Sequence, residues 1–387
     1  MSLVALRAVR HAFAIAVVTL VASPAAAVPW AVMPWAQLAP LNIYAATGAD
    51  RLGPATAGAL ARIYVPNHSS DTVSVIDPVT LKVVDTYHVG RKPQHVIPAW
   101  DLKTLWVANN GGRNNKGASL TPIDPLTGKP GVEIKVSDPY NMYFMPDGSA
   151  AIVVNEALKR LDFRDPKTMA LQSSMTTPTC HGINHADFAA DGSYAVFTCE
   201  FHGGGLVKLD LQHKTVLGTL MLPKMGMPQD IRLSPDGTVF YVADMKNDGV
   251  WEIDGANFME IGFIPTGIGA HGLAVSRDGT KLYVANRGSH GMTRSKPNGP
   301  GSVTVIDFAT RQIVAQWPVP DGGSPDMGNV SADGKQLWLS GRYDNVVYAF
   351  DTTTGEVRVI PVGKEPHGLT VWPQPGRYSL GHTGNMR

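Results

Sequence analysis

The sequence has no excess of charge of either sign, because Lys and Arg together number 33 and Asp and Glu number 32 in 387 residues. A chain without a net field has no broad electrostatic attraction to nucleic acid or to an anionic membrane surface. We therefore expect neither nucleic acid nor a lipid surface as a partner.

Cysteine is scarce, and several familiar catalytic motifs are missing. The two cysteines are Cys180 and Cys199, and no CxxCH occurs, which excludes covalently attached c-type haem. There is also no P-loop, no dinucleotide fingerprint, no HExxH and no Ser-His-Asp ordering. The chemistry of those enzyme classes is not indicated.

Long hydrophobic runs are absent, and the apolar segment near the N-terminus is too short for a comfortable membrane span. Arg7 and Arg10 precede "AFAIAVVTLVA", which is followed by the small residues "SPAAA". This pattern predicts a secretory signal peptide over residues 1–27, cleaved near Ala27, with an uncleaved anchor as the alternative. We expect a periplasmic or secreted protein with no membrane span after cleavage.

The two cysteines would then lie in an oxidising compartment. A disulfide between Cys180 and Cys199 is the expected state, and loop-closure reasoning gives it about 3 kcal/mol of stabilisation. It would brace the loop that carries His181 and His185. A thiolate metal ligand is the alternative.

Glycine (40 residues) and proline (29 residues) are both plentiful, which favours an all-β protein with many tight turns. Apolar segments with period-2 alternation recur along the chain, separated by Asp-Gly turns. The recurring second-strand segments are "RIYVPN", "TLWVANN", "AAIVVNE", "YAVFTCE", "TVFYVAD", "KLYVANR" and "QLWLSGR". They predict four-stranded antiparallel units of about 40 to 55 residues.

Such units can bury both faces only by packing radially, as the blades of a seven-bladed β-propeller. The strand counts match only if the C-terminal strand, 367–372, completes the blade begun by residues 62–89. That pairing closes the ring and leaves no free edge. We thus expect an extended N-terminal arm over residues 28–60, the propeller over 61–372 and a tail over 373–387.

The segments "LYVANRGS", "VPNHSSDTVSVIDPVTLKVV" and "KEPHGLTV" resemble the YVTN-type seven-bladed propellers over nearly all of residues 61–372. The chain is also distantly similar to the propeller domains of nitrous-oxide reductase and periplasmic nitrite reductase. The similarity to nitrous-oxide reductase implies copper held by histidines, and the similarity to nitrite reductase implies a haem d-type ligand. The chain has neither a cupredoxin-like domain nor an attached cytochrome domain, so the whole reactions of those enzymes are not implied.

The histidines are expected at one end of the propeller. We call the end where the innermost strands begin the loop face, and the end that carries the Asp-Gly turns the turn face. Among the histidines after the signal peptide, His213 alone is expected at the turn face. The tail should leave from that face too, with His382 outside the central channel. So one-sided a distribution indicates a site on the axis.

Alignment of the innermost strands gives a ring of polar side chains around the axis, and imidazoles with carboxylates suit Cu, Zn or Fe. The predicted metal ligands are His95, His185, Asp230, His271 and His367. The predicted ligand-binding residues are Gln94, Asn141, Asn184, Gln229, Asp326, Arg113, Arg287 and Arg342. Hydrogen bonding to loop backbones is the simpler interpretation of the same residues.

Three functions follow as hypotheses. The first is a metal or cofactor site on the axis, with copper favoured over zinc, iron or calcium, in an oxidoreductase that meets a periplasmic redox or surface protein. The second is a non-catalytic binding or scaffold propeller. The third, by resemblance to propeller lactonases, is a hydrolase with Asp230 or His185 as the base.

Overall fold

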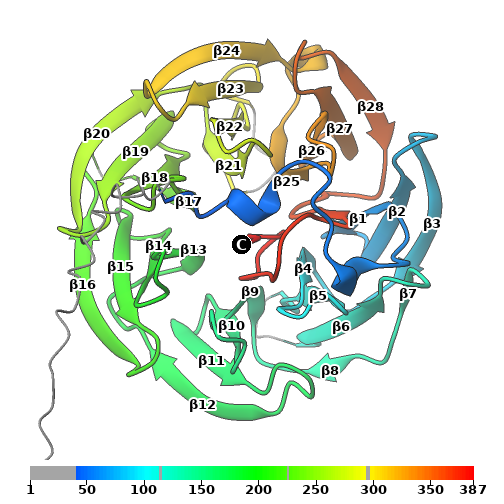
Figure 1. Cartoon of the computed structure of the whole chain (residues 1–387), viewed down its shortest axis with the longest axis horizontal. Coiled ribbons are helices and arrows are strands. Elements are labelled where there is room, and N and C mark those ends of the chain that lie inside the picture. The colour runs from blue at the N-terminus through cyan, green and yellow to red at the C-terminus, as the bar shows by residue number, and fades with distance from the viewer. Residues whose placement is uncertain (1–40, 113–115, 225, 293–296) are drawn as a thin grey trace, which may run out of the picture. The chain divides into compact units, whose positions relative to one another are not determined.

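The computed structural model describes residues 41–112, 116–224, 226–292 and 297–387 (Figure 1). The predicted signal peptide, residues 28–40 of the predicted arm, and Arg113 lie outside these ranges. No helix in the described part of the chain has the length and hydropathy needed to cross a bilayer.

Seven antiparallel sheets surround a central axis in the order of the chain, which confirms the predicted all-β propeller (Figure 1). From the axis outward, the first blade consists of β29 (Thr370–Trp372), β1 (Arg62–Asn67), β2 (Thr72–Asp77) and β3 (Lys82–His88). The second consists of β4 (Pro93–Pro98), β5 (Leu105–Asn109), β6 (Ser119–Asp124) and an outer strand in two pieces, β7 (Lys129–Pro130) and β8 (Ile134–Lys135). The third consists of β9 (Pro139–Phe144), β10 (Ala151–Asn155), β11 (Arg160–Arg164) and β12 (Leu171–Thr176).

The other four blades have the same order. They are β13 (Ile183–Phe188), β14 (Ala195–Cys199), β15 (Gly205–Asp210) and β16 (Thr215–Met221); β17 (Pro228–Leu233), β18 (Val239–Asp244), β19 (Gly249–Asp254) and β20 (Met259–Pro265); β21 (Ala270–Val275), β22 (Lys281–Asn286), β23 (Ser302–Asp307) and β24 (Gln312–Pro318); and β25 (Pro325–Val330), β26 (Gln336–Gly341), β27 (Val346–Asp351) and β28 (Val357–Pro361).

The ring closes as the sequence predicts. Strand β29 pairs antiparallel with β1, with Trp372 opposite Arg62 and Thr370 opposite Tyr64. The first blade is therefore built from both ends of the propeller sequence, and none of its inner strands is left unpaired.

A recurring asparagine explains why the second and third strands of several blades hold together at the loop face. Asn67, the last residue of β1, donates from Nδ2 to Thr72 Oγ1 at 3.1 Å and to Ser74 Oγ at 3.0 Å on β2. Asn109 and Asn286 make the equivalent pair of bonds in their own blades. These side chains are fully buried, so the paired hydroxyls spare each amide the cost of an unsatisfied donor.

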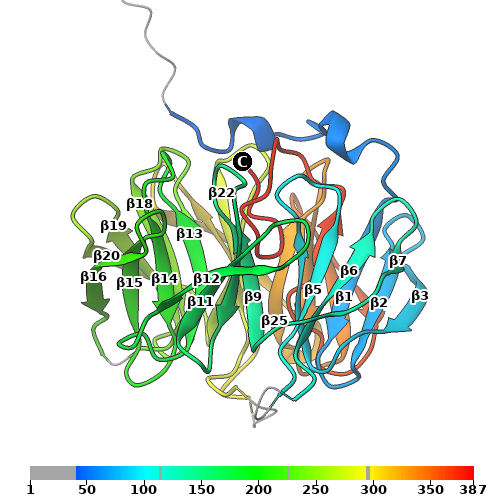
Figure 2. The same ribbon diagram turned by 90° about the horizontal axis from the view of Figure 1, so that it is seen from below.

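The described part of the arm, residues 41–60, crosses the turn face and contains two short 3₁₀ helices, η1 (Ala45–Thr47) and η2 (Pro54–Thr56) (Figure 2). A third such helix, η4 (Pro320–Gly322), lies between β24 and β25. The arm is tied to the blades by backbone bonds from Ile43 N to Pro235 O at 2.9 Å and from Asp50 N to Ala332 O at 2.8 Å.

The tail departs from expectation, because it enters the central channel from the turn face (Figures 1 and 2). It folds back on itself, with Ser379 bridged to Met386. His382 at its tip donates its backbone N–H to Met142 O on β9 at 2.8 Å. Gly381 makes this possible, because its φ is +107° and a Cβ there would collide with the backbone of Met142 and Tyr143.

Buried charge holds the tail in place. Arg387 Nη2 lies 2.6 Å from Asp187 Oδ1 on β13, and Asn385 Nδ2 donates to the same oxygen at 2.7 Å. The Arg387 guanidinium also packs over the Tyr44 ring of the arm, 5.0 Å from its centroid. Arm and tail together therefore cover the channel at the turn face.

Candidate functional site

Irregular pairing at the start of the innermost strands aims polar side chains at the axis. Between Ile183 and Ala186, for example, the pairing of β13 with β14 slips, and the two residues in the slip are Asn184 and His185. A β-bulge bends the strand and redirects its side chains. Equivalent register shifts lie at Pro93/His95, Pro228/Ile231, Ala270/Gly272, Pro325/Gly328 and next to Asn141. The polar residues at these strand starts, together with His367 shortly before β29, are called the first ring: Gln94, His95, Asn141, Asn184, His185, Gln229, Asp230, His271, Asp326 and His367.

Three histidines of the channel form a compact group. His95 and His185 come from the first ring and His382 from the tail, and all three are fully buried. Their ring centroids are 4.8 to 5.4 Å apart, and one potential ligand atom from each lies within 4.8 Å of the others. The histidine that the sequence analysis placed outside the channel thus belongs to the densest imidazole cluster.

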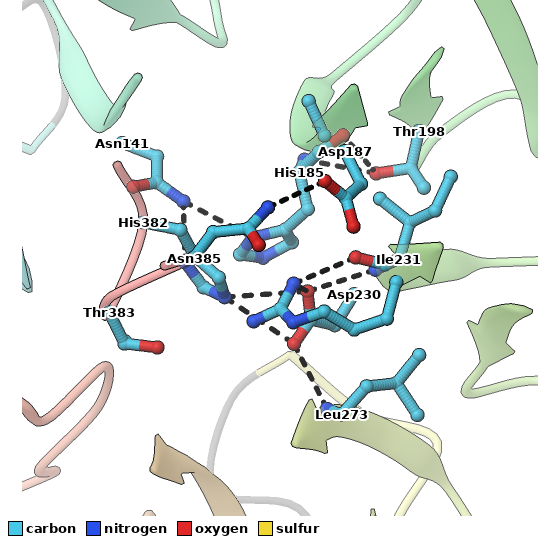
Figure 3. Close-up of polar contacts among 12 residues, drawn as sticks. Asn141, His185, Asp187, Thr198, Asp230, Ile231, Leu273, His382, Thr383 and Asn385 are labelled. Carbon is cyan, nitrogen blue, oxygen red and sulfur yellow. Dashed lines mark hydrogen bonds and ion pairs between the residues drawn. The ribbon is translucent and has the colours of Figure 1, made fainter. Parts of the chain in front are cut away.

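Asn141 organises two of these rings (Figure 3). Its Nδ2 lies 3.0 Å from His382 Nδ1 and 3.2 Å from His185 Nδ1, while its Oδ1 accepts from Met142 N at 2.8 Å. Two imidazole lone pairs therefore converge on one donor group. His95 differs, because neither of its ring nitrogens has a hydrogen-bond partner among the described residues.

Asp230, a predicted metal ligand, is already satisfied by the protein. It accepts from Arg232 Nη1 at 2.6 Å, from the backbone N–H of Ile231 and from that of Leu273, and it lies 3.3 Å from His382 Nε2 (Figure 3). These contacts assign it the task of orienting His382 and the neighbouring strands.

A second group contains His271, Asp326 and His367, which are also buried and close enough to share an ion. His271 Nδ1 lies 2.7 Å from Asp326 Oδ1, and Arg287 Nη2 lies 2.9 Å from that oxygen and 2.6 Å from His271 Nε2. The guanidinium already supplies a positive charge at this point. A metal cation would be repelled there, so this group is the poorer metal site of the two.

The first-ring imidazoles and His382 of the tail are held in their neutral form. Burial lowers the pKa of His95, His185, His367 and His382 well below the usual value. Repulsion from His382 adds to this effect at His95 and His185. Arg342 adds to it at His367, and Arg232 adds to it at His382. Burial and Arg287 lower the pKa of His271 to about 4. Although burial alone would raise it, Arg287 and His271 hold the pKa of Asp326 well below its usual range. Neutral imidazole is the form that ligates metals.

A second ring lies above the first at the loop face. It consists of the residue directly after the second strand of each blade, and the seven are His68, Asn110, Glu156, Glu200, Met245, Arg287 and Arg342. Of these seven, the sequence predicts only Arg287 and Arg342 as ligand-binding residues. The others could have been found by aligning the repeats at this position, because the ring carries two carboxyl groups and two guanidinium groups.

Glu156 and Glu200 share a hydrogen bond, and burial followed by mutual repulsion raises the pKa of Glu156 well above its usual value. Asn184 Nδ2 donates to Glu200 at 3.1 Å and Gln229 Nε2 donates to it at 2.9 Å. These two predicted ligand-binding residues are thus directed at Glu200. Gln94 instead accepts from His367 Nδ1 at 3.0 Å.

A cavity of about 190 Å³ opens between the two rings. Its polar lining includes His68, Gln94, Tyr140, Glu156, His271, Arg287, Arg342 and His367. Beside it, Cys180 and Cys199 form the expected disulfide, so neither sulfur is available as a thiolate ligand.

The sequence and the fold both have counterparts among known proteins. Antigen Lp49 of Leptospira interrogans serogroup Icterohaemorrhagiae serovar copenhageni is 28% identical over 188 residues, which are 42% of this chain and 38% of that protein. The match therefore spans well under half the length of that relative.

Solved propellers are similar in fold at low sequence identity. The dihydro-heme d1 dehydrogenase NirN, in complex with DHE, is 16% identical with a TM-score of 0.59, over 80% of this chain and 75% of that one. A proposed 6-phosphogluconolactonase of Bacteroides uniformis is 17% identical with a TM-score of 0.62, over 80% and 98%. The YNCE-like beta-propeller model matches residues 16–375, and the chain belongs to that family.

Proposed function

We propose that this chain is an exported propeller that binds a transition-metal ion, with copper favoured, through His95, His185 and His382. The observation that carries the proposal is the group of three fully buried, neutral imidazoles whose ligand atoms lie within 4.8 Å of one another. Three imidazoles are a common ligand set, and they leave a further coordination position for a small molecule.

Copper is favoured because an imidazole site binds it more tightly than the other divalent first-row metals. Binding requires the Asn141 amide to turn aside, since its Nδ2 now occupies the point on which the His185 and His382 lone pairs converge. His95 needs no such change, because its nitrogens have no partner among the described residues.

Export is supported by the pattern of Arg7, Arg10 and the following apolar run, and by the disulfide at Cys180 and Cys199. A bound copper ion would supply one-electron chemistry, and we propose an oxidoreductase role on that basis. NirN is a dehydrogenase on the same fold, but the cavity of about 190 Å³ is below the roughly 300–1,000 Å³ of ordinary cofactor pockets. A macrocycle would not fit this cavity, and the proposed metal site is the separate group of three histidines.

The test is elemental analysis of protein purified from an exported fraction, together with the visible and paramagnetic resonance spectra of the copper-loaded form. We expect bound copper in the wild type and its loss in His185→Ala and His382→Ala. His213→Ala is the matched control, because that imidazole is exposed at the turn face, where it pairs with Asp210.

Absence of metal above background in the wild type after copper loading would refute the proposal and favour a scaffold role. An equal copper content in all the variants would show that the metal binds elsewhere in the protein.

A further inference from the structure

Arg342 is a buried cation without a direct ion pair among the described residues, although its charge acts on Asp326 and Glu365 from a greater distance. It is 8% exposed at the end of β26, and its Nε and Nη1 have no hydrogen-bond partner among the described residues. No described carboxylate forms an ion pair with it. A buried charge left without a partner costs several kcal/mol in general, so its retention requires a compensating group.

The other buried arginines show what Arg342 lacks. Arg232 is 2.6 Å from Asp230, Arg287 is 2.9 Å from Asp326, and Arg387 is 2.6 Å from Asp187. Arg164 pairs with Asp162, and Arg277 donates to the carbonyl oxygens of Val330 and Ser331. Each of these five has its acceptor within the protein.

The Arg342 side chain lines the cavity between the two rings. Gln94, which also lines the cavity, uses its oxygen for His367, and this leaves its amide N–H groups free to donate. The proton of Glu156 is taken up by its hydrogen bond to Glu200, so this carboxyl group adds no negative charge to the lining. A cavity lined by a guanidinium and neutral donors complements a species rich in acceptor oxygens.

We propose that this cavity is a binding site for a small oxyanion, either a carboxylate or an inorganic oxyanion, held by the Arg342 guanidinium. The volume of about 190 Å³ limits the ligand to a few heavy atoms, since one water takes about 30 Å³ of liquid volume. This site is separate from the three-histidine group and does not depend on a metal being bound there.

The experiment follows thermal unfolding of the full chain, stripped of metal by a chelator, with rising acetate, nitrate or phosphate at constant ionic strength set by chloride. We expect a saturable rise in the Tm of the wild type, as ligand binding to the native state requires. The acetate arm identifies an organic carboxylate, and the nitrate and phosphate arms identify an inorganic ion.

Arg342→Gln should show no saturable rise, while its Tm without oxyanion should equal or exceed that of the wild type, because the unpaired charge has been removed. Arg358→Gln is the matched control, since Arg358 is exposed on β28 of the same blade, and it should respond as the wild type does. The proposal is overturned if none of the three anions gives a saturable rise in the wild type, or if Arg342→Gln responds equally. Because metal is absent throughout, neither result bears on the copper proposal.

Discussion

At the scale of single residues, the loop face depends on the proton shared by Glu156 and Glu200. The two carboxyl groups are hydrogen-bonded to each other, and Glu200 also accepts from Asn184 and Gln229. Two enclosed carboxylates cannot both ionise cheaply, so one holds a proton at pH values where an exposed glutamate would have lost it.

This pair makes stability depend on pH. A raised carboxyl pKa stabilises the folded state fully below the unfolded value of 4.5, and the stabilisation is lost as the pH rises through the folded value. Glu156→Gln keeps a donor for Glu200 and removes the titration. We expect little change in the free energy of unfolding at pH 4 and a gain of about 1–3 kcal/mol at pH 8. Denaturant titration measures the free energy at both pH values.

The control is Glu356→Gln, since Glu356 is exposed on the rim of the last blade and should have no effect at either pH. An equal loss of stability at both pH values in Glu156→Gln would show that the carboxyl pair contributes only packing.

At the scale of elements, the tail hairpin is the segment that completes the three-histidine group. It is held by Arg387, whose guanidinium is buried against Asp187. Asp187 also accepts from the backbone N–H groups of Phe188 and Leu233, so it links the tail to two adjacent blades.

Arg387→Ala should therefore lower the free energy of unfolding by about 3–5 kcal/mol, because Asp187 is left buried without its cation. Urea unfolding measures this loss. Adding Asp187→Asn to the same chain should recover part of it. Strictly additive losses in the double variant would argue that the ion pair does not hold the tail.

The fold could be predicted from the sequence because each blade repeats its own signals locally, and β29 was placed by counting strands. The tail could not be. The tail sequence has no alternation of apolar and polar residues, and its partners lie far along the chain. Arg387 is 200 residues from Asp187, and His382 is 152 residues from Asp230. The first ring was predictable from strand starts, but only coordinates show that Asp230 is satisfied by Arg232 and the backbone.

At the scale of the whole molecule, stability depends on closing the ring. Val371 on β29 is 5% exposed and packs with Ile63, Trp338 and Ile360 at the seam between the first and last blades. Truncating this side chain weakens the contact that joins the two ends of the propeller sequence.

We expect Val371→Ala to cost about 2 kcal/mol in the free energy of unfolding, from lost apolar burial and the space left behind. Val359→Ala removes the same atoms from the exposed outer strand β28, where the side chain is 44% exposed, and should change stability by about 0.5 kcal/mol or less. Calorimetric unfolding compares the two. Equal losses would mean that the closing strand carries no special share of the stability.

The tail hairpin inside the channel also determines from which side a ligand can reach the channel. Because arm and tail cover the turn-face end, the approach that the described residues leave to His271 and His367 is the cavity at the loop face, which Arg342 and Glu156 also line. A ligand would enter and leave by that same cavity, so a molecule bound at its mouth would slow both association and dissociation.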